Sequence, residues 1–389
     1  MSRDFVPEVI PTVLEAEASV RVDILDDDLF RGPKDLLYKP PGARGTFGGQ
    51  VCSQALMAAA HTVPAEVPIH SFHCYFILAG DSERDIIYHV KRLRDGKSFF
   101  TRSVVAKQGG KALFTMAAQF HTPEPSRGLS YHEPMPQVYT PDQLMDIRDY
   151  WKSIADHPGI RESLRDYINS AQRRPISVDQ RIVHRSFLKN DLTYRDELIP
   201  HLWPLMVGNG KAERFIWMKS RTPLTGGPNI HKCVIAYMSD MAFIPTAMEP
   251  LFNNRSTNPA PRITMTVSLD HSMWFHALPD QKLRADEWLL FGMTCHVTGG
   301  ARALLTAKVW NQKGHLVVTV KQEALIRLQD PDLKKQSKLY MHWPILYGRT
   351  RTQKRSRPKS EKKRITREVL GGLIMDINIQ LFRNNNPMS

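Results

Sequence analysis

The four cysteines of this 389-residue chain lie far apart in the sequence and form no CxxC pair. Zinc sites and disulfide frameworks place their cysteines at short or regular spacings, so neither is indicated by Cys52, Cys74, Cys233 and Cys295. We expect buried free thiols and no bound metal. No apolar run approaches the ~20 residues that a membrane helix needs, so no membrane span is expected. Met1–Pro7 has no basic region followed by an apolar run, so we expect no cleaved secretory signal.

Three widespread catalytic or cofactor-binding motifs are also missing. Without a GxSxG segment, the strained nucleophile elbow of the α/β-hydrolases is excluded. No GxGxxG follows a strand-like run, so a dinucleotide cofactor is not indicated. Gly96-Lys97-Ser98 resembles the end of a P-loop, but that motif also needs a glycine where this chain has Lys91. A turn between two strands is the better interpretation, and no cofactor is indicated.

The chain carries 53 Lys and Arg against 39 Asp and Glu, a formal net charge of +14 that is unevenly distributed. From Tyr340 to Ser389 there are 11 basic and 3 acidic residues, so over half of the excess lies in this tail. Basic runs such as Lys354–Arg357 are usually solvated, although they also occur in nuclear signals and at anionic surfaces. Because the main body is nearly balanced, we expect no nucleic-acid partner.

A buried helix followed by an antiparallel meander is the predicted plan of the first third. Small and apolar residues occupy nearly every face of Phe47–Thr62, which is typical of a helix at the centre of a domain, and Pro64 ends it. Gly109-Gly110 forms a hairpin turn between the last two strands. This combination indicates an α+β layer architecture. The strand-like runs are Ile69–Leu78, Asp85–Arg94, Phe99–Lys107 and Lys111–Phe120.

The second half repeats this plan. His70-Ser71-Phe72 matches His271-Ser272-Met273 at an offset of 201 residues, and further identities follow at offsets of 201 and 204. Their common order and spacing indicate an internal duplication of about 120 residues. A short apolar helix is predicted at Asp240–Met248. The predicted strands of this half are Ile263–Ser268, Glu287–His296, Ala301–Trp310 and His315–Ile326.

Four segments make up the predicted domain organisation. Residues 1–125 form the N-terminal repeat, and residues 184–330 form the C-terminal repeat, which we expect to hold the functional site. The polar, Pro-interrupted segment 126–183 is predicted to be a linker that packs on the surface, with a helical pattern near 141–171. The basic extension 331–389 continues neither repeat, and we expect it to be disordered.

The most polar strand-like stretch is Ser268–His276, which combines hydroxyls, a carboxylate and two imidazoles with two large aromatic residues. Buried polar groups each need a partner, so we interpret this stretch as the wall of a site. The adjacent Asp270 and His271 suggest a catalytic dyad, but neighbours on a strand point to opposite faces. Since His271 has a counterpart in His70, a structural role is the better interpretation for both histidines.

Two further polar residues stand among apolar neighbours and are ambiguous from the residues alone. Asp240 is either the N-cap of the predicted helix or a buried acid that orients a water molecule, and the cap is the simpler interpretation. Gln322, on the last predicted strand, either satisfies a neighbouring polar group or holds a reactive water.

Six separated segments carry a family resemblance. They are Gly48-Gly49-Gln50, His70–His73, Leu93–Phe99, Tyr237–Asp240, Asp270–His276 and Gln322-Glu323. In this order they resemble the type II acyl-CoA thioesterases, a family that includes bacterial TesB and the peroxisomal acyl-CoA thioesterase of eukaryotes. The resemblance extends from Arg31 to Leu339, and the segment Asp270–His276 is especially distinctive.

The resemblance implies an α+β double hotdog fold, in which two copies of a long helix are each wrapped by an antiparallel sheet. It implies hydrolysis of an acyl-CoA substrate to fatty acid and CoA without a cofactor. Carried over by motif, the catalytic residues are Asp240, Ser268 and Gln322, which position a water for direct attack on the thioester. It also implies self-association into a homo-oligomer and a single active site, so an equivalent pocket near Gln50 is expected to be inactive.

Two other functions are compatible with the residues. A hotdog hydratase or dehydratase acting on acyl-CoA needs a catalytic histidine near an acid on the central helix, and His61 lies at the wrong end of that helix. A non-catalytic acyl-CoA-binding protein needs no catalytic residues, whereas all three family positions are occupied here.

Ser337-Lys338-Leu339 follows the second repeat and has the sequence of a peroxisomal address. The family resemblance therefore implies a peroxisomal location. Further residues follow, up to Ser389, and the address is read only at a free C-terminus. We expect the address to be masked in this chain, with the cytosol as the alternative location.

Overall fold

A computed structural model describes residues 15–40, 43–122, 124, 130–156, 158, 162–172, 177–183, 212–253, 263–276 and 283–329. The chain divides into two compact units, Met1–Pro331 and Asp332–Ser389, and all described residues belong to the first. The predictions of a disordered extension at 331–389 and of an address at Ser337–Leu339 therefore lie outside the described residues.

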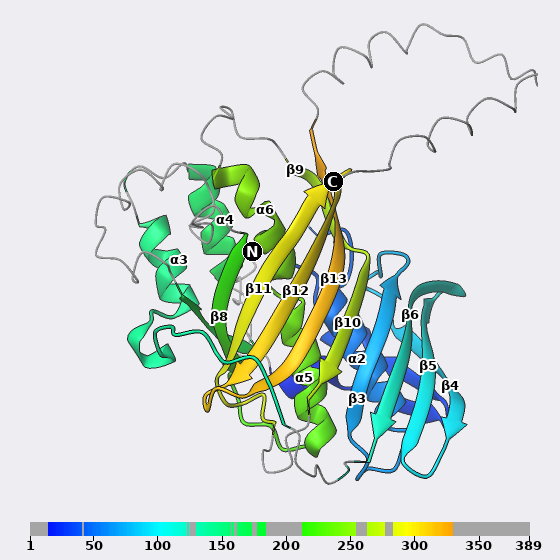
Figure 1. Cartoon of the computed structure of the whole chain (residues 1–389). Coiled ribbons are helices and arrows are strands. Elements are labelled where there is room, and N and C mark those ends of the chain that lie inside the picture. The colour runs from blue at the N-terminus through cyan, green and yellow to red at the C-terminus, as the bar shows by residue number, and fades with distance from the viewer. Residues whose placement is uncertain are drawn as a thin grey trace, which may run out of the picture. The chain divides into compact units, whose positions relative to one another are not determined.

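The first repeat consists of a buried helix, α2, on one face of an antiparallel sheet (Figure 1). Ten of the thirteen residues of α2 are buried, as its lack of a polar face predicts. The last hairpin turns at Gly109 and Gly110, whose φ angles of 53° and 77° lie in the left-handed region that glycine tolerates. The elements are α1 (Ala16–Val20), β1 (Asp23–Asp26), β2 (Leu29–Gly32), η1 (Lys34–Leu36), α2 (Gly48–Ala60), β3 (Ile69–Phe76), β4 (Ile86–Asp95), β5 (Phe99–Gln108) and β6 (Lys111–His121).

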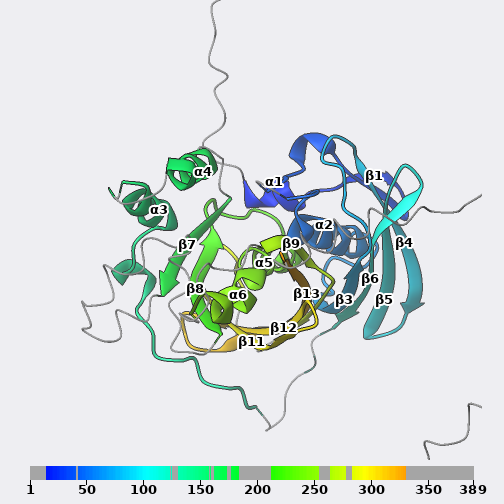
Figure 2. The ribbon, with the colours of Figure 1, turned by 90° about the horizontal axis from the view of Figure 1, so that it is seen from above.

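The second repeat has the same plan, and its strands curve around α5 and α6 when the molecule is viewed from above (Figure 2). The four predicted strands of this half are confirmed, with ends within three residues of the prediction. The elements from the segment between the repeats onward are η2 (Pro141–Gln143), α3 (Ile147–Ala155), α4 (Glu162–Gln172), β7 (Val178–Val183), β8 (Glu213–Ser220), α5 (Pro228–Ser239), α6 (Phe243–Asn253), β9 (Ile263–Ser268), β10 (Asp270–Phe275), β11 (Leu289–Gly299), β12 (Arg302–Asn311) and β13 (Leu316–Leu328).

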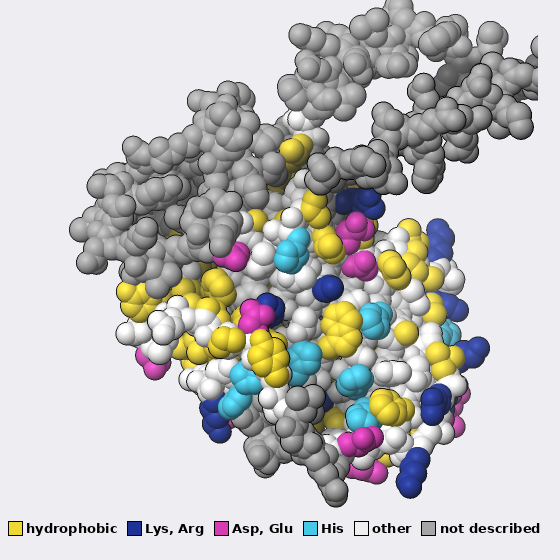
Figure 3. Space-filling model, in the orientation of Figure 1, with side chains coloured by type: hydrophobic (Ala, Val, Ile, Leu, Met, Phe, Trp, Pro, Cys, Tyr) yellow, Lys and Arg dark blue, Asp and Glu magenta, His cyan; other side chains and the backbone are white. Residues whose placement is uncertain are grey.

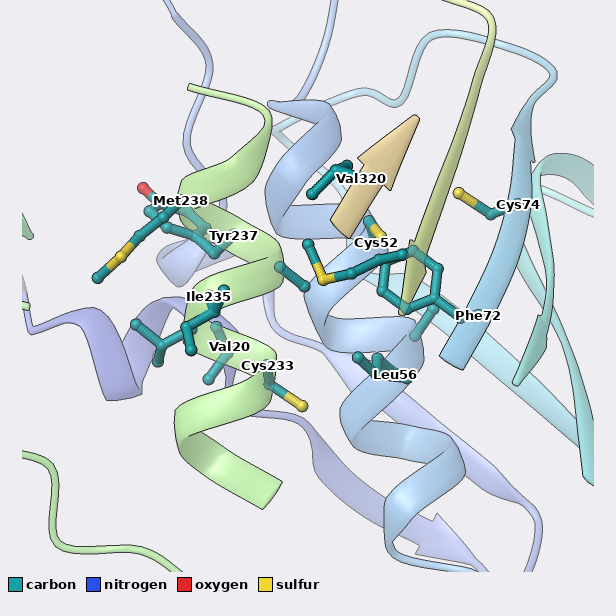
Figure 4. Packing of buried hydrophobic residues seen from close by; sticks show 14 of the residues in the cluster. Val20, Cys52, Leu56, Phe72, Cys74, Cys233, Ile235, Tyr237, Met238 and Val320 are labelled. Atoms are coloured by element: carbon teal, nitrogen blue, oxygen red, sulfur yellow. The ribbon is translucent and has the colours of Figure 1, made fainter. Parts of the chain in front are cut away.

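The two halves form one sheet in the order β1-β2-β4-β5-β6-β3-β10-β13-β12-β11-β8-β7, and β9 pairs with β13. At the junction between β3 and β10, Phe72 pairs with Met273, which is its own counterpart in the duplication. The repeats are therefore related as the subunits of a two-fold dimer would be. Figure 4 shows Cys52 and Leu56 of α2 close to Cys233 of α5, within one shared core. This arrangement confirms the double hotdog.

The predicted helix at Asp240–Met248 corresponds to α6, which begins at Phe243, and the helix before it was not predicted. A longer helix, α5, begins at Pro228 and leaves Asp240 as its C-cap residue, and α6 begins only after two further residues. Proline suits the first helical position because the N–H that it lacks would have no partner there. The polar side chains of His231 and Lys232 concealed this helix in the sequence, although both are buried in the fold.

Two helices occupy the segment between the repeats and confirm the helical pattern predicted there. α3 and α4 pack around Ala155 and Ile168, which form a small cluster separate from the main core. The strand β7 follows them and pairs with β8. The exact limits of the four predicted segments stay a prediction. Within the described parts of the chain, no helix combines the length and the apolar character needed to cross a membrane.

The outer face of the sheet carries a group of histidines beside apolar side chains (Figure 3). His73 Nδ1 lies 3.0 Å from Ser272 Oγ, and its ring meets Trp274 edge-on. His276 Nε2 lies 2.8 Å from Thr319 Oγ1. Because successive residues of a strand point to opposite faces, these side chains lie on the face away from the central helices, whereas His271 points inward and is buried.

Candidate active site

Asp240, Ser268 and Gln322 meet beside the first turn of α2. Ser268 Oγ donates a hydrogen bond to Asp240 Oδ1 at 3.0 Å, and Gln322 Nε2 donates to Ser268 Oγ at 2.8 Å. Sheet register makes the contact possible, because β9 places Ser268 opposite Ala324 on β13, two residues from Gln322. The structure thus brings together all three residues that the family resemblance implied, from the end of a helix and from two strands.

The first turn of α2 encloses the carboxyl group of Asp240. The backbone N–H of Gly49 donates to this carboxyl group. A Cβ at Gly48 would lie 2.9 Å from Asp240 Oδ2, and a Cβ at Gly49 would lie 2.7 Å from the carbonyl oxygen of Tyr237. Glycine is required for so close an approach of the helix. The N–H groups of a first helical turn and the helix dipole favour a negative charge at this position.

The interpretation of Asp240 as the N-cap of its own helix is wrong, although its carboxyl group does lie at a helix N-terminus. Asp240 ends α5 and does not begin a helix of its own. Its carboxyl group nevertheless accepts an N–H at a helix N-terminus, that of α2 in the other repeat. The contact depends on the packing of α2 against α5, which no local sequence pattern reveals.

The expectation of a separate, inactive pocket near Gln50 is also wrong in its position. Gln50 lies in the same turn as Gly49, and its buried amide accepts the N–H of Tyr38 at 2.7 Å and donates to the carbonyl of Leu36 at 2.7 Å. The N-terminus of α2 therefore belongs to the Asp240 site, and Gln50 fastens the preceding loop to it.

The counterpart of the site in the first repeat lies at the other end of α2. The three corresponding residues are His61, Val67 and Ala118, which occupy the C-cap of α2 and the duplication offsets of 201 and 204. The ring of His61 stacks on Phe30 with centroids 5.7 Å apart. This counterpart lacks the combination of carboxyl, hydroxyl and amide groups, so the described part of the chain contains the full set once.

Burial raises the pKa of Asp240 from its ordinary 3.8 to about 6, and hydrogen bonds from Ser268, Gln322 and the Gly49 N–H oppose part of this shift. A carboxyl group with such a pKa is mostly ionised at neutral pH and is a stronger base than an exposed aspartate. Both properties suit a general base, which works best when its pKa lies near the pH of the reaction.

His271 contacts this set of residues, although the sequence suggested only a structural role. Its Nδ1 lies 2.6 Å from Gln322 Oε1, and its Nε2 lies 3.0 Å from Ser239 Oγ. Burial lowers the pKa of His271 to about 4, so the ring is neutral at physiological pH. Asp270 instead accepts the N–H of Glu323 at 2.7 Å. The two adjacent residues therefore form no dyad, as their positions on a strand predict.

The four cysteines are free, as expected, with Cys52, Cys74 and Cys233 buried and Cys295 partly exposed. In the part of the chain that the structure describes, no group of three His, Cys, Asp or Glu side chains could hold a metal ion.

Several known proteins are similar to this chain. Acyl-coenzyme A thioesterase 8 of Rattus norvegicus is 35% identical over 328 residues, which cover 84% of this chain and 91% of that protein. Acyl-CoA thioesterase 2 of Haemophilus influenzae is 29% identical over 80% of this chain and 96% of its own length. Peroxisomal acyl-coenzyme A thioester hydrolase 1 of Saccharomyces cerevisiae is 26% identical over 75% of this chain and 89% of its own length.

Solved structures agree with these relationships. The acyl-CoA thioesterase II TesB2 from Mycobacterium marinum superposes with a TM-score of 0.57 and 31% sequence identity, covering 81% of this chain and 98% of its own. A hot dog protein from Alicyclobacillus acidocaldarius, only 15% identical, has the same TM-score of 0.57 over 81% of this chain and 98% of its own, and shows the shared fold alone.

Fold and site together define the class of protein, a thioester hydrolase with the hotdog fold. Residues 38–121 match the acyl-CoA thioesterase N-terminal domain, and residues 185–326 match the acyl-CoA thioesterase C-terminal domain. The chain belongs to the acyl-CoA thioesterase family, of the type II, TesB-like kind.

Proposed function

We propose that this protein hydrolyses fatty acyl-CoA to a free fatty acid and CoA by direct attack of water on the thioester carbonyl. The observation that carries the proposal is the hydrogen-bonded set of Asp240, Ser268 and Gln322 at the N-terminus of α2. Its buried carboxyl group has a pKa close to neutrality. The set thus combines a base with two neutral groups that can hold a water molecule.

In the proposed reaction, Asp240 takes a proton from the attacking water while the water oxygen bonds to the carbonyl carbon. The carbonyl oxygen becomes an oxyanion, which the positive end of the α2 dipole stabilises. The tetrahedral intermediate then breaks its C–S bond. The proton on Asp240 passes to the departing sulfur, which releases CoA and the fatty acid and restores the carboxylate.

Ser268 and Gln322 hold the water in line with the carbonyl carbon, which lowers the entropic cost of the attack. The Ser268 hydroxyl is bonded on both sides, since it donates to Asp240 and accepts from Gln322. We therefore assign it to positioning and not to covalent catalysis. An acyl group found on Ser268 by mass spectrometry after rapid quenching would overturn that assignment.

Asp240→Asn tests the proposal, because it removes the base and changes the side chain little in size. Thiol release from a series of acyl-CoA chain lengths should fall at least a hundredfold in this variant, since general-base catalysis contributes about 10²–10⁴ in rate. Asp270→Asn is the matched control and should keep its activity, because Asp270 bonds only to the backbone of Glu323 in the described structure. Near wild-type hydrolysis by Asp240→Asn would refute the proposal.

The same experiment separates the two alternative functions. A hydratase acting on acyl-CoA would change the absorbance of an enoyl-CoA and release no thiol. A binding protein would retain acyl-CoA on a column without turnover. Neither His61 nor His271 suits the catalytic role in a hydratase. His61 stacks on Phe30 at the far end of α2, and His271 is bonded to Gln322.

The location and assembly of the protein are part of the proposal. The yeast relative is named as peroxisomal, which supports a peroxisomal location, with the cytosol as the alternative. Imaging of N-terminally tagged chains ending at Leu339 and at Ser389 would show whether Ser337–Leu339 is read in each form. Self-association, proposed by analogy with the family, is testable by light scattering of the purified chain.

A further inference from the structure

His271 and Ser239 extend the Asp240 set into one chain of hydrogen bonds. The chain runs from Ser239 to His271, Gln322, Ser268 and Asp240, with donor–acceptor distances of 3.0, 2.6, 2.8 and 3.0 Å. His271 is 1% exposed and Gln322 is fully buried. Both side chains are therefore held by their protein partners, and each bond fixes the next.

The direction of every bond follows from the carboxylate. Ionised Asp240 only accepts, so the single hydrogen of the Ser268 hydroxyl points to it. Ser268 Oγ must then accept from the amide, which turns Gln322 Nε2 toward Ser268 and Gln322 Oε1 toward His271. That oxygen needs a donor, so the proton of the neutral His271 ring is on Nδ1.

The other ring nitrogen completes the arrangement. Nε2 of His271 is then an acceptor, and the hydroxyl of Ser239, 3.0 Å away, is its donor. This hydroxyl also lies 2.8 Å from the carbonyl oxygen of Ala236, so its one hydrogen is shared between two acceptors. Phe72 stacks on the imidazole with centroids 5.9 Å apart and an interplanar angle of 15°, which fixes the ring plane.

We infer that His271 is a positioning residue, whose Nδ1–H holds the Gln322 amide in the one orientation that donates to Ser268. The inference rests on the proposed function. Without this donor the amide is free to turn over and present its oxygen to Ser268. The hydroxyl hydrogen would then be drawn from Asp240 to the amide, and the water would lose its two fixed neighbours.

His271→Phe removes the donor while keeping a ring that can stack on Phe72. We expect kcat for acyl-CoA hydrolysis to fall at least tenfold and KM to stay within threefold, because the ring is 1% exposed and acts through Gln322. His271→Asn places an amide N–H near the position of Nδ1 and should recover most of kcat. His70→Phe is the matched control from the first repeat and should behave like the wild type.

Two results would overturn the inference, namely a wild-type kcat in His271→Phe or equal losses in His271→Phe and His271→Asn. If His271→Phe does not fold, His271→Leu replaces it, since leucine and asparagine have nearly the same shape and differ in the donor. Equal kcat values for the Leu and Asn variants would then reject the role. An active Asp240→Asn variant would reject the proposed function itself, whereas an inactive one beside a fully active His271→Phe would reject only the positioning role.

Discussion

Lowering the pH should stop turnover, because Asp240, the proposed base, must be ionised to take a proton from water. Burial raises its pKa to about 6. With that value, roughly nine-tenths of the enzyme carries the base at pH 7 and about one-tenth at pH 5. We therefore expect kcat to fall about tenfold over these two units, and about tenfold for each further unit of acidification.

Ser268 supplies an internal check on the direction of this effect. Its hydroxyl donates to Asp240 and so favours the ionised carboxylate, which lowers the pKa of Asp240. Ser268→Ala removes that donor, and the pKa of Asp240 should rise. The acid limb of the profile should then move to higher pH, in addition to a general loss of rate.

The measurement should follow kcat, which reports the enzyme–substrate complex, with a dithiodipyridine assay for released thiol that works in acid. Phosphate monoesters such as that of CoA titrate near pH ~6 and can alter binding in the same range. An acyl-pantetheine thioester, which has no phosphate, is therefore the control substrate. A kcat that is constant from pH 7 down to pH ~4.5 with both substrates would refute the assignment of Asp240 as base.

Two further substitutions test the packing around α2. Gly48→Ala should lower kcat at least tenfold, because its Cβ would lie 2.9 Å from Asp240 Oδ2, whereas Gly227→Ala, with no atom within 4 Å of its Cβ, should leave kcat unchanged. Arg102→Leu should lower the free energy of unfolding in urea by about 2–4 kcal/mol with kcat retained. Arg102 is 1% exposed and donates to Thr62 at the far end of α2. An unchanged unfolding midpoint would contradict this expectation.

Short-range patterns predicted most of the fold. Alternating side chains located β3 to β6 with ends within two residues, and an all-apolar surface located α2. The identities at constant offset predicted the duplication. The pairing of Phe72 with its counterpart Met273 shows that a two-fold axis relates the two repeats. α5 was not predicted, because His231 and Lys232 interrupt an apolar stretch. The burial of these two side chains depends on contacts with distant parts of the chain. Lys232 donates to the carbonyl of Ile69, and His231 accepts the N–H of Ala285.

The sequence named the three residues that we propose for the site, but not how they are arranged. Family resemblance, and not periodicity, singled out Asp240, Ser268 and Gln322. Nothing in the sequence places Gly49 against Asp240, because these residues belong to different repeats and meet only where α2 packs on α5. Nor does it place His271 against Gln322, since that contact requires the pairing of β10 with β13.

The amino-acid sequence by itself determined the strands, the duplication and the family, because these depend on local periodicity and on residue identity. The tertiary structure alone decided what each polar group does. It made Asp240 the C-cap of one helix and the acceptor at the N-terminus of another, and it gave the neutral His271 a bond to Gln322. The physical reason is that pKa values and hydrogen-bond directions depend on burial and on partners, which come together only when the two repeats pack.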